Sequence, residues 1–170
     1  MTRRRRGNGE GSGGSELLGA GYNTAVCGWR VYRRDTHTLY WLVSGTKSLT
    51  NEALVAIGES QAAGALFVSP ITAWELAIAA RKPLHKDPPQ LNSTISNWFR
   101  AAVRATSAKV VPIQQKIAIE AAEIPVATGH KDPGDCDLIA TSRVRKVPII
   151  MRDSVVRRLA INGYLDVIVC

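Results

Sequence analysis

The sequence predicts one three-layer α/β/α domain built on a central, mainly parallel sheet. Two observations lead to this class. The 170 residues are enough for a single domain with a sizeable core, and short apolar segments alternate with longer segments of helical periodicity. Because a crossover helix makes successive strands parallel, this alternation predicts a parallel sheet with helices on both faces.

Five short apolar segments are predicted strands, each bounded by turn residues or by a helical pattern. They are 29–34, 65–68, 109–113, 148–151 and 166–169. Seven segments with apolar residues at helical spacing are predicted helices. They are 39–43, 50–63, 70–81, 94–105, 114–123, 133–146 and 154–161.

Capping residues mark three of the helix starts. Thr50 is an N-cap, Ser69 caps a helix with Pro70 in its first position, and Asp132 does the same before Pro133. Prolines interrupt residues 83–91, which are predicted to form a loop.

The positive charge is concentrated near the N-terminus. The chain carries 22 Lys and Arg against 14 Asp and Glu, and seven Arg but only two Glu fall in the first 34 residues. Residues 1–24 are predicted to be a disordered Gly/Arg-rich leader, and 25–170 the folded domain. The leader is either an arm that attracts phosphate or a segment without that role. The second alternative is a solvated tail, or a start codon placed too early.

Several classes are excluded by composition. No apolar run is long enough to cross a membrane, and no apolar segment follows the N-terminal arginines as an export signal requires, so a cytoplasmic protein is predicted. Cys27, Cys136 and Cys170 are odd in number and far apart, which indicates neither a disulfide framework nor a zinc site.

Two acidic residues follow predicted strands. Asp35 directly follows the first strand, and Asp153 follows the strand at 148–151 after one further residue. Since ligands bind beyond the carboxyl ends of parallel strands, both carboxylates are candidates for a site there. The alternative for each is a helix N-cap.

Two further carboxylates lie on helices. Glu75 has apolar neighbours one turn away in both directions, so it is either a ligand or part of a structural ion pair. Asp135 shares a face with Leu138 and Ile139, although an acidic residue at this point of a helix also suits the dipole. Asp137 lies on a different side and is the weaker candidate.

A cluster of carboxylates without well-spaced His or Cys is an oxygen-only site, which selects Mg²⁺ or Mn²⁺. Such ions clamp phosphate oxygens and activate water. If the four groups meet, the chemistry that they favour is metal-dependent phosphodiester hydrolysis.

On these residues the chain resembles the PIN-domain ribonucleases of the VapC type, the toxin half of toxin–antitoxin pairs. The resemblance covers about residues 35–169, and its segments keep the family's order and spacing. They are Asp35-Thr36-His37, Val68-Ser69, Trp74-Glu75-Leu76, His130-Lys131-Asp132-Pro133-Gly134-Asp135, Leu138-Ile139-Ala140-Thr141 and Pro148-Ile149-Ile150 with Asp153.

The resemblance implies a fold, a reaction and partners. Asp35, Glu75, Asp135 and Asp153 would be catalytic ligands of Mg²⁺ or Mn²⁺, with Thr36 supporting Asp35. The implied reaction is endonucleolytic cleavage of RNA by a metal-activated water. The implied partners are a cognate antitoxin and a second copy of the chain. His130 and Lys131 would either contact RNA or lie in a mobile loop.

The chain departs from the family in three places. Arginines stand in or beside the first strand, Met151 replaces a Thr or Ser, and Cys136 and Asp137 replace an Arg and an apolar residue. These departures favour an alternative, a PIN-like module with weakened or no catalysis that binds antitoxin or RNA. A small phosphohydrolase with Asp35 as nucleophile is a third possibility. It is disfavoured because His37 stands where that class needs a second Asp.

Overall fold

The computed structural model describes residues 25–27 and 38–170 of the chain. Its strands form one five-stranded sheet in the order β3-β2-β1-β4-β5, and all four pairings are parallel. The strands are β1 (Ala25–Cys27), β2 (Leu66–Val68), β3 (Lys109–Val110), β4 (Ile149–Met151) and β5 (Val167–Val169). The predicted parallel sheet is therefore confirmed.

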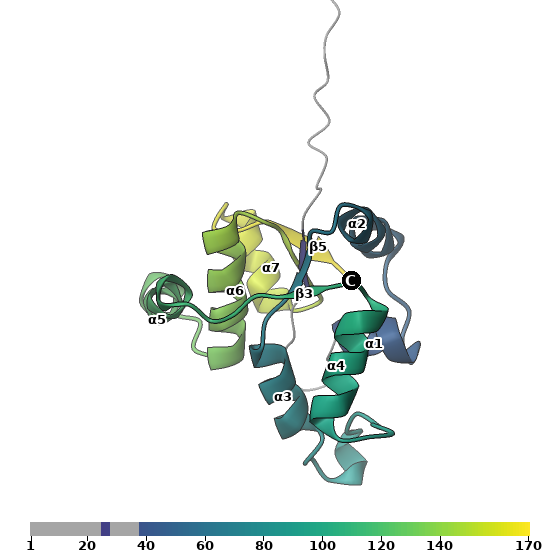
Figure 1. The fold of residues 1–170 in the computed structure, drawn as a ribbon. Helices are drawn as coiled ribbons and strands as arrows, with labels where there is room; N and C mark the ends of the chain where they lie inside the picture. Colours follow the sequence, from purple (N-terminus) through teal and green to yellow (C-terminus); the bar gives the residue numbers. More distant parts are fainter. Residues whose placement is uncertain (1–24, 28–37) are drawn as a thin grey trace, which may run out of the picture.

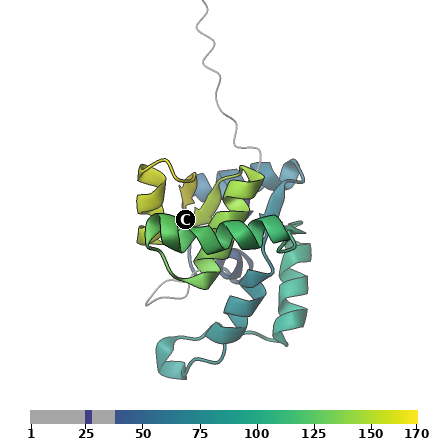
Figure 2. The same ribbon diagram turned by 90° about the vertical axis from the view of Figure 1, so that its left-hand side faces the viewer.

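Seven α-helices of the described chain surround this sheet. They are α1 (Thr38–Ser44), α2 (Asn51–Ala62), α3 (Ile71–Ala79), α4 (Ile95–Ala105), α5 (Gln115–Thr128), α6 (Pro133–Arg145) and α7 (Ser154–Ile161). Helix α6 packs on β1 and β4, whereas α2 packs on the opposite side against β1, β2 and β5 (Figure 1). Helix α5 lies across the outside of α6 (Figure 2). The three-layer architecture follows from this arrangement.

The described first strand precedes the predicted range. Strand β1 occupies Ala25–Cys27, in the middle of the sheet between β2 and β4. The predicted range 29–34, with its arginines, lies outside the described residues, as does the leader 1–24. The three arginines of that range are thus not part of the described strand.

Helix α5 is longer than predicted. It runs through Pro125 to Thr128, although a proline inside a helix removes a hydrogen bond and costs about 3 kcal/mol. Ile117 and Ile124 on this helix are buried, and the helix packs along α6. Burial of these side chains offsets the cost of the proline, which a local reading of the sequence takes as a stop.

Helix α3 marks the carboxyl edge of the sheet. It begins shortly after β2 ends at Val68, and it contacts both α4 and α6 (Figure 1). The core behind this edge is apolar, with Leu76, Leu138 and Ile150 fully buried. None of the helices in the described chain has the length and apolar character needed to cross a membrane.

Candidate functional site

Glu75 lies in the interior at the point where α3 meets the start of α6. Its side chain is 2% exposed. It packs against Gly134 so closely that a Cβ built on that glycine would lie 2.1 Å from Glu75 Oε1. Only a residue without a side chain leaves room for the carboxylate here. Glu75 is therefore buried, and its carboxylate lies against the first turn of α6.

The next residue along α6 is the second buried carboxylate. Asp135 is fully buried, and its backbone N–H donates to Asp132 Oδ1 at 3.1 Å. Asp132 is thus the N-cap of α6, with Pro133 in the first helical position, as predicted. The cap sets the residue at which α6 starts. It thereby places Asp135 next to Gly134, the residue against which Glu75 packs.

Sequence reasoning missed the partner of Asp135. His130, predicted to contact RNA or lie in a mobile loop, is buried, and its Nε2 lies 2.7 Å from Asp135 Oδ2. When Asp135 is ionised it can only accept a hydrogen bond, and His130 then donates it from Nε2. The spacing of five residues across a proline-containing helix start is not a motif that a sequence reading recognises.

Asp137, the weaker candidate, is also buried. It is 5% exposed, and Ser69 Oγ donates to its Oδ2 at 2.7 Å. Burial raises the pKa of Asp137, and the hydrogen bond from Ser69 opposes that shift. Ser69 Oγ also accepts from the backbone N–H of Ile71 at 3.3 Å. Asp137 therefore ties α6 to the first turn of α3, the helix that carries Glu75.

Asp153 caps α7 at the carboxyl end of β4. Its Oδ1 accepts from the backbone N–H groups of Val155 at 2.7 Å and Val156 at 3.0 Å. The cap interpretation of this residue is thus correct. A carboxylate has two oxygens and several lone pairs, so capping does not exclude a further role at this edge.

Asp35 and Thr36 lie outside the described residues. Within residues 25–27 and 38–170, no group of three or more His, Cys, Asp or Glu side chains is close enough to hold a metal ion. The structure brings Glu75 against the residue that precedes Asp135.

Electrostatics at α6 and α3 agree with a negative site. Burial, together with the charges of Asp135 and Asp132, raises the pKa of Cys136 to about 11, so this thiol stays protonated at neutral pH. Burial and the neighbouring Lys86 lower the pKa of Lys82, and the charge of Glu75 opposes them. A cationic side chain therefore lies within electrostatic range of Glu75.

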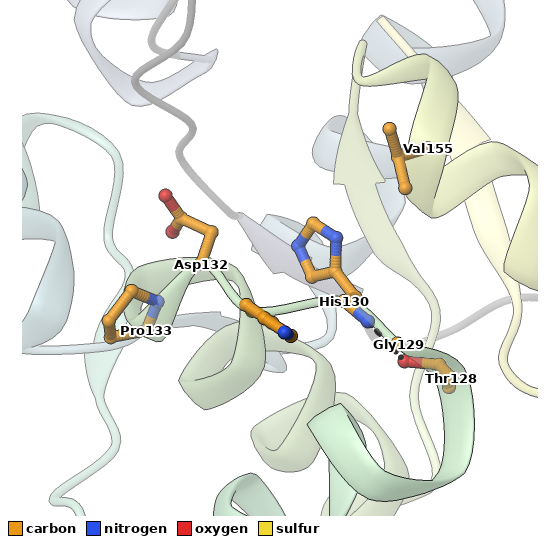
Figure 3. A pocket seen from close by; sticks show the side chains of 7 residues that line it. Thr128, Gly129, His130, Asp132, Pro133 and Val155 are labelled. Carbon is orange, nitrogen blue, oxygen red and sulfur yellow. Dashed lines mark hydrogen bonds between the residues drawn. The ribbon is translucent and has the colours of Figure 1, made fainter.

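A pocket of about 390 Å³ opens beside His130 and the start of α6 (Figure 3). It lies between the loop that joins α5 to α6 and the first turn of α7, with His130 and Val155 facing the same space. The lining residues are Thr128, Gly129, His130, Lys131, Asp132, Pro133 and Val155. The pocket reaches from His130, which contacts Asp135, to α7, the helix that Asp153 caps.

The donor set fits Mg²⁺ or Mn²⁺. Glu75 and Asp135 would supply carboxylate oxygens, the ligands that these ions prefer, and both carboxylates are buried. The absence of a side chain on Gly134 leaves the space in which the Glu75 carboxylate lies.

Comparison with known proteins identifies related families and folds. The family model of the PIN domain matches residues 34–162. A toxin–antitoxin complex from Klebsiella pneumoniae is 18% identical with a TM-score of 0.50, covering 85% of this chain and 96% of that one. The DNA-bound VapBC from Salmonella typhimurium is 12% identical with a TM-score of 0.52, covering 86% and 97%.

VapBC-5 from Mycobacterium tuberculosis is 16% identical with a TM-score of 0.50, covering 86% and 97%. At these identities the solved structures show a shared fold and no more. A search of curated proteins found no match.

Proposed function

Because the chain belongs to the PIN domain family, we propose that it is an endoribonuclease dependent on Mg²⁺ or Mn²⁺, and the toxin of a toxin–antitoxin pair. The observation that carries the proposal is the buried Glu75 carboxylate, seated on Gly134 beside the buried Asp135. Carboxylate oxygens are the ligands that Mg²⁺ and Mn²⁺ prefer, and ligands of parallel sheets bind at the carboxyl edge of the strands.

Each residue has a proposed role. Glu75 and Asp135 hold the cation from α3 and α6, Asp153 from the end of β4, and Asp35 completes its ligands. When bound, the ion neutralises these carboxylates, polarises the scissile phosphate and activates water. Lys82, within electrostatic range of Glu75, attracts the RNA backbone toward the site.

The proposed protein partners are a cognate antitoxin and a second copy of the chain. Among the structures of the same fold, that from Klebsiella pneumoniae is a toxin–antitoxin complex, and that from Mycobacterium tuberculosis is a member of a family of toxin–antitoxin systems. Trp74 and Ile78 lie one turn apart on α3 and are 49% and 40% exposed, so apolar surface next to the site is available for a protein partner.

Cleavage of RNA by the purified full-length chain tests the proposal. We expect cleavage with Mn²⁺ or Mg²⁺ that is abolished by EDTA. The variant Glu75→Gln should lower the rate by more than about 100-fold, since a ligand contributes more than its supporting residues. Glu123→Gln is the matched control, because Glu123 is exposed on α5. Cleavage that persists in EDTA or in Glu75→Gln would contradict the proposal.

One observation favours a second candidate, a PIN-like module that binds RNA or antitoxin without cutting. Met151, two positions before Asp153, is 2% exposed in β4, where a Thr or Ser could orient water through its hydroxyl. Folded protein that binds Mn²⁺ but cleaves no RNA would support this candidate over the first.

A further inference from the structure

We infer that His130 is a positioning residue that holds the Asp135 carboxylate in the orientation needed for metal binding. The inference rests on the proposed function, in which Asp135 is a ligand. Its basis is the contact between His130 Nε2 and Asp135 Oδ2 at 2.7 Å, where the two side chains are 5% and 0% exposed. Solvent therefore does not replace either partner.

The backbone of His130 is itself anchored. Its N–H donates to Thr128 Oγ1 at 3.1 Å, and that hydroxyl donates to the carbonyl of Ile124 at 2.7 Å (Figure 3). Gly129, between them, ends α5 with a left-handed φ of 73°, a conformation that glycine adopts without strain. The Cys136 thiol donates to the His130 carbonyl at 3.5 Å.

These contacts connect the end of α5 to the first turn of α6. The backbone of His130 is held by Thr128 at the end of α5 and by Cys136, and its imidazole contacts the carboxylate of Asp135. A hydrogen bond from a buried donor restricts the side-chain torsions of a carboxylate, and metal sites keep ligand distances within about 0.2 Å. His130 therefore restricts the Asp135 side chain before an ion binds, so that less conformational freedom is lost on binding.

Outer-shell partners of this kind change metal affinity by about 10- to 100-fold when they are removed. Because Nε2 is engaged by Asp135, the expected role of the ring is to orient the carboxylate. This role requires an N–H donor at the position of Nε2, and it does not require an imidazole ring. Glutamine, whose amide nitrogen reaches a similar distance from the backbone, should replace it in part.

The test is a Mn²⁺ titration of the full chain followed by the paramagnetic resonance signal of free Mn²⁺. His130→Met removes the N–H with little change in side-chain length and should weaken Mn²⁺ binding by about 10- to 100-fold. His130→Gln keeps a donor and should stay within about threefold of the wild type. His85→Ala, on an exposed histidine of the segment Leu84–Lys86, should leave binding unchanged.

Thermal unfolding of each metal-free variant checks that it folds. Asp135→Asn separates the hypothesis of a metal site at Asp135 from the hypothesis that His130 positions this carboxylate. Suppose that Asp135→Asn loses Mn²⁺ binding. If His130→Met then binds Mn²⁺ like the wild type, or if His130→Gln binds it as weakly as His130→Met, the role of His130 is wrong and the metal site stands. If Asp135→Asn binds Mn²⁺ normally, or the wild type does not bind it, the proposed metal site fails, and this inference with it.

Discussion

Replacing Gly134 with alanine puts a methyl group where α6 meets the Glu75 carboxylate. The new Cβ would lie 2.1 Å from Oε1, 2.7 Å from Cδ and 3.3 Å from Cγ of Glu75. Since ordinary carbon–oxygen contacts are about 3.3 Å or longer, Oε1 must retreat by about 1.2 Å. Such a shift is several times the tolerance of about 0.2 Å in a metal site.

The same substitution has opposing effects on stability. Alanine is better than glycine in a helix by up to about 1 kcal/mol. Moving Glu75 out of its rotamer costs about 0.5–1.5 kcal/mol. The two nearly cancel, so the unfolding temperature should change by less than about 4 °C. We therefore expect a folded protein whose Mn²⁺ affinity is reduced by at least about 10-fold.

Isothermal titration calorimetry with Mn²⁺, beside thermal unfolding, measures both effects. The matched control is Gly58→Ala, because an added Cβ at Gly58 on α2 meets nothing within 4 Å. That variant should gain stability from helix propensity and bind Mn²⁺ like the wild type. If Gly134→Ala also binds Mn²⁺ like the wild type, Glu75 is not a ligand in the position described.

Two other predictions concern groups around the site. Ser69→Ala leaves the buried Asp137 carboxyl without the hydroxyl that donates to it at 2.7 Å. The free energy of unfolding, measured in urea, should therefore fall by about 1–3 kcal/mol. An unchanged urea midpoint would show that this hydrogen bond does not stabilise the fold. Burial raises the pKa of Cys170 above 9.0. The folded state therefore keeps a proton that the unfolded state loses, and stability should fall as pH rises above about 9. Cys170→Ala should show a smaller fall over that range, and equal slopes for the two proteins would refute the argument.

The sequence by itself determined the order and type of the described elements. Alternation of strand and helix patterns predicts the parallel sheet, and the caps at Thr50 and Asp132 locate helix starts to within a residue. These signals are local, because a capping side chain bonds to the backbone two or three residues away. The same local logic fails at Pro125, where burial of Ile124 carries α5 past a residue that normally ends a helix.

The tertiary structure decided which polar side chains of α6 are inside. All residues from 134 to 142 are buried, since the sheet, α5 and α3 cover this helix from several sides. A helix buried all round has no solvent face, so periodicity cannot separate Asp135 from Asp137. The contacts of Glu75 with Gly134 and of Asp137 with Ser69 join segments far apart in the chain, and only the packing of α3 on α6 brings them within reach.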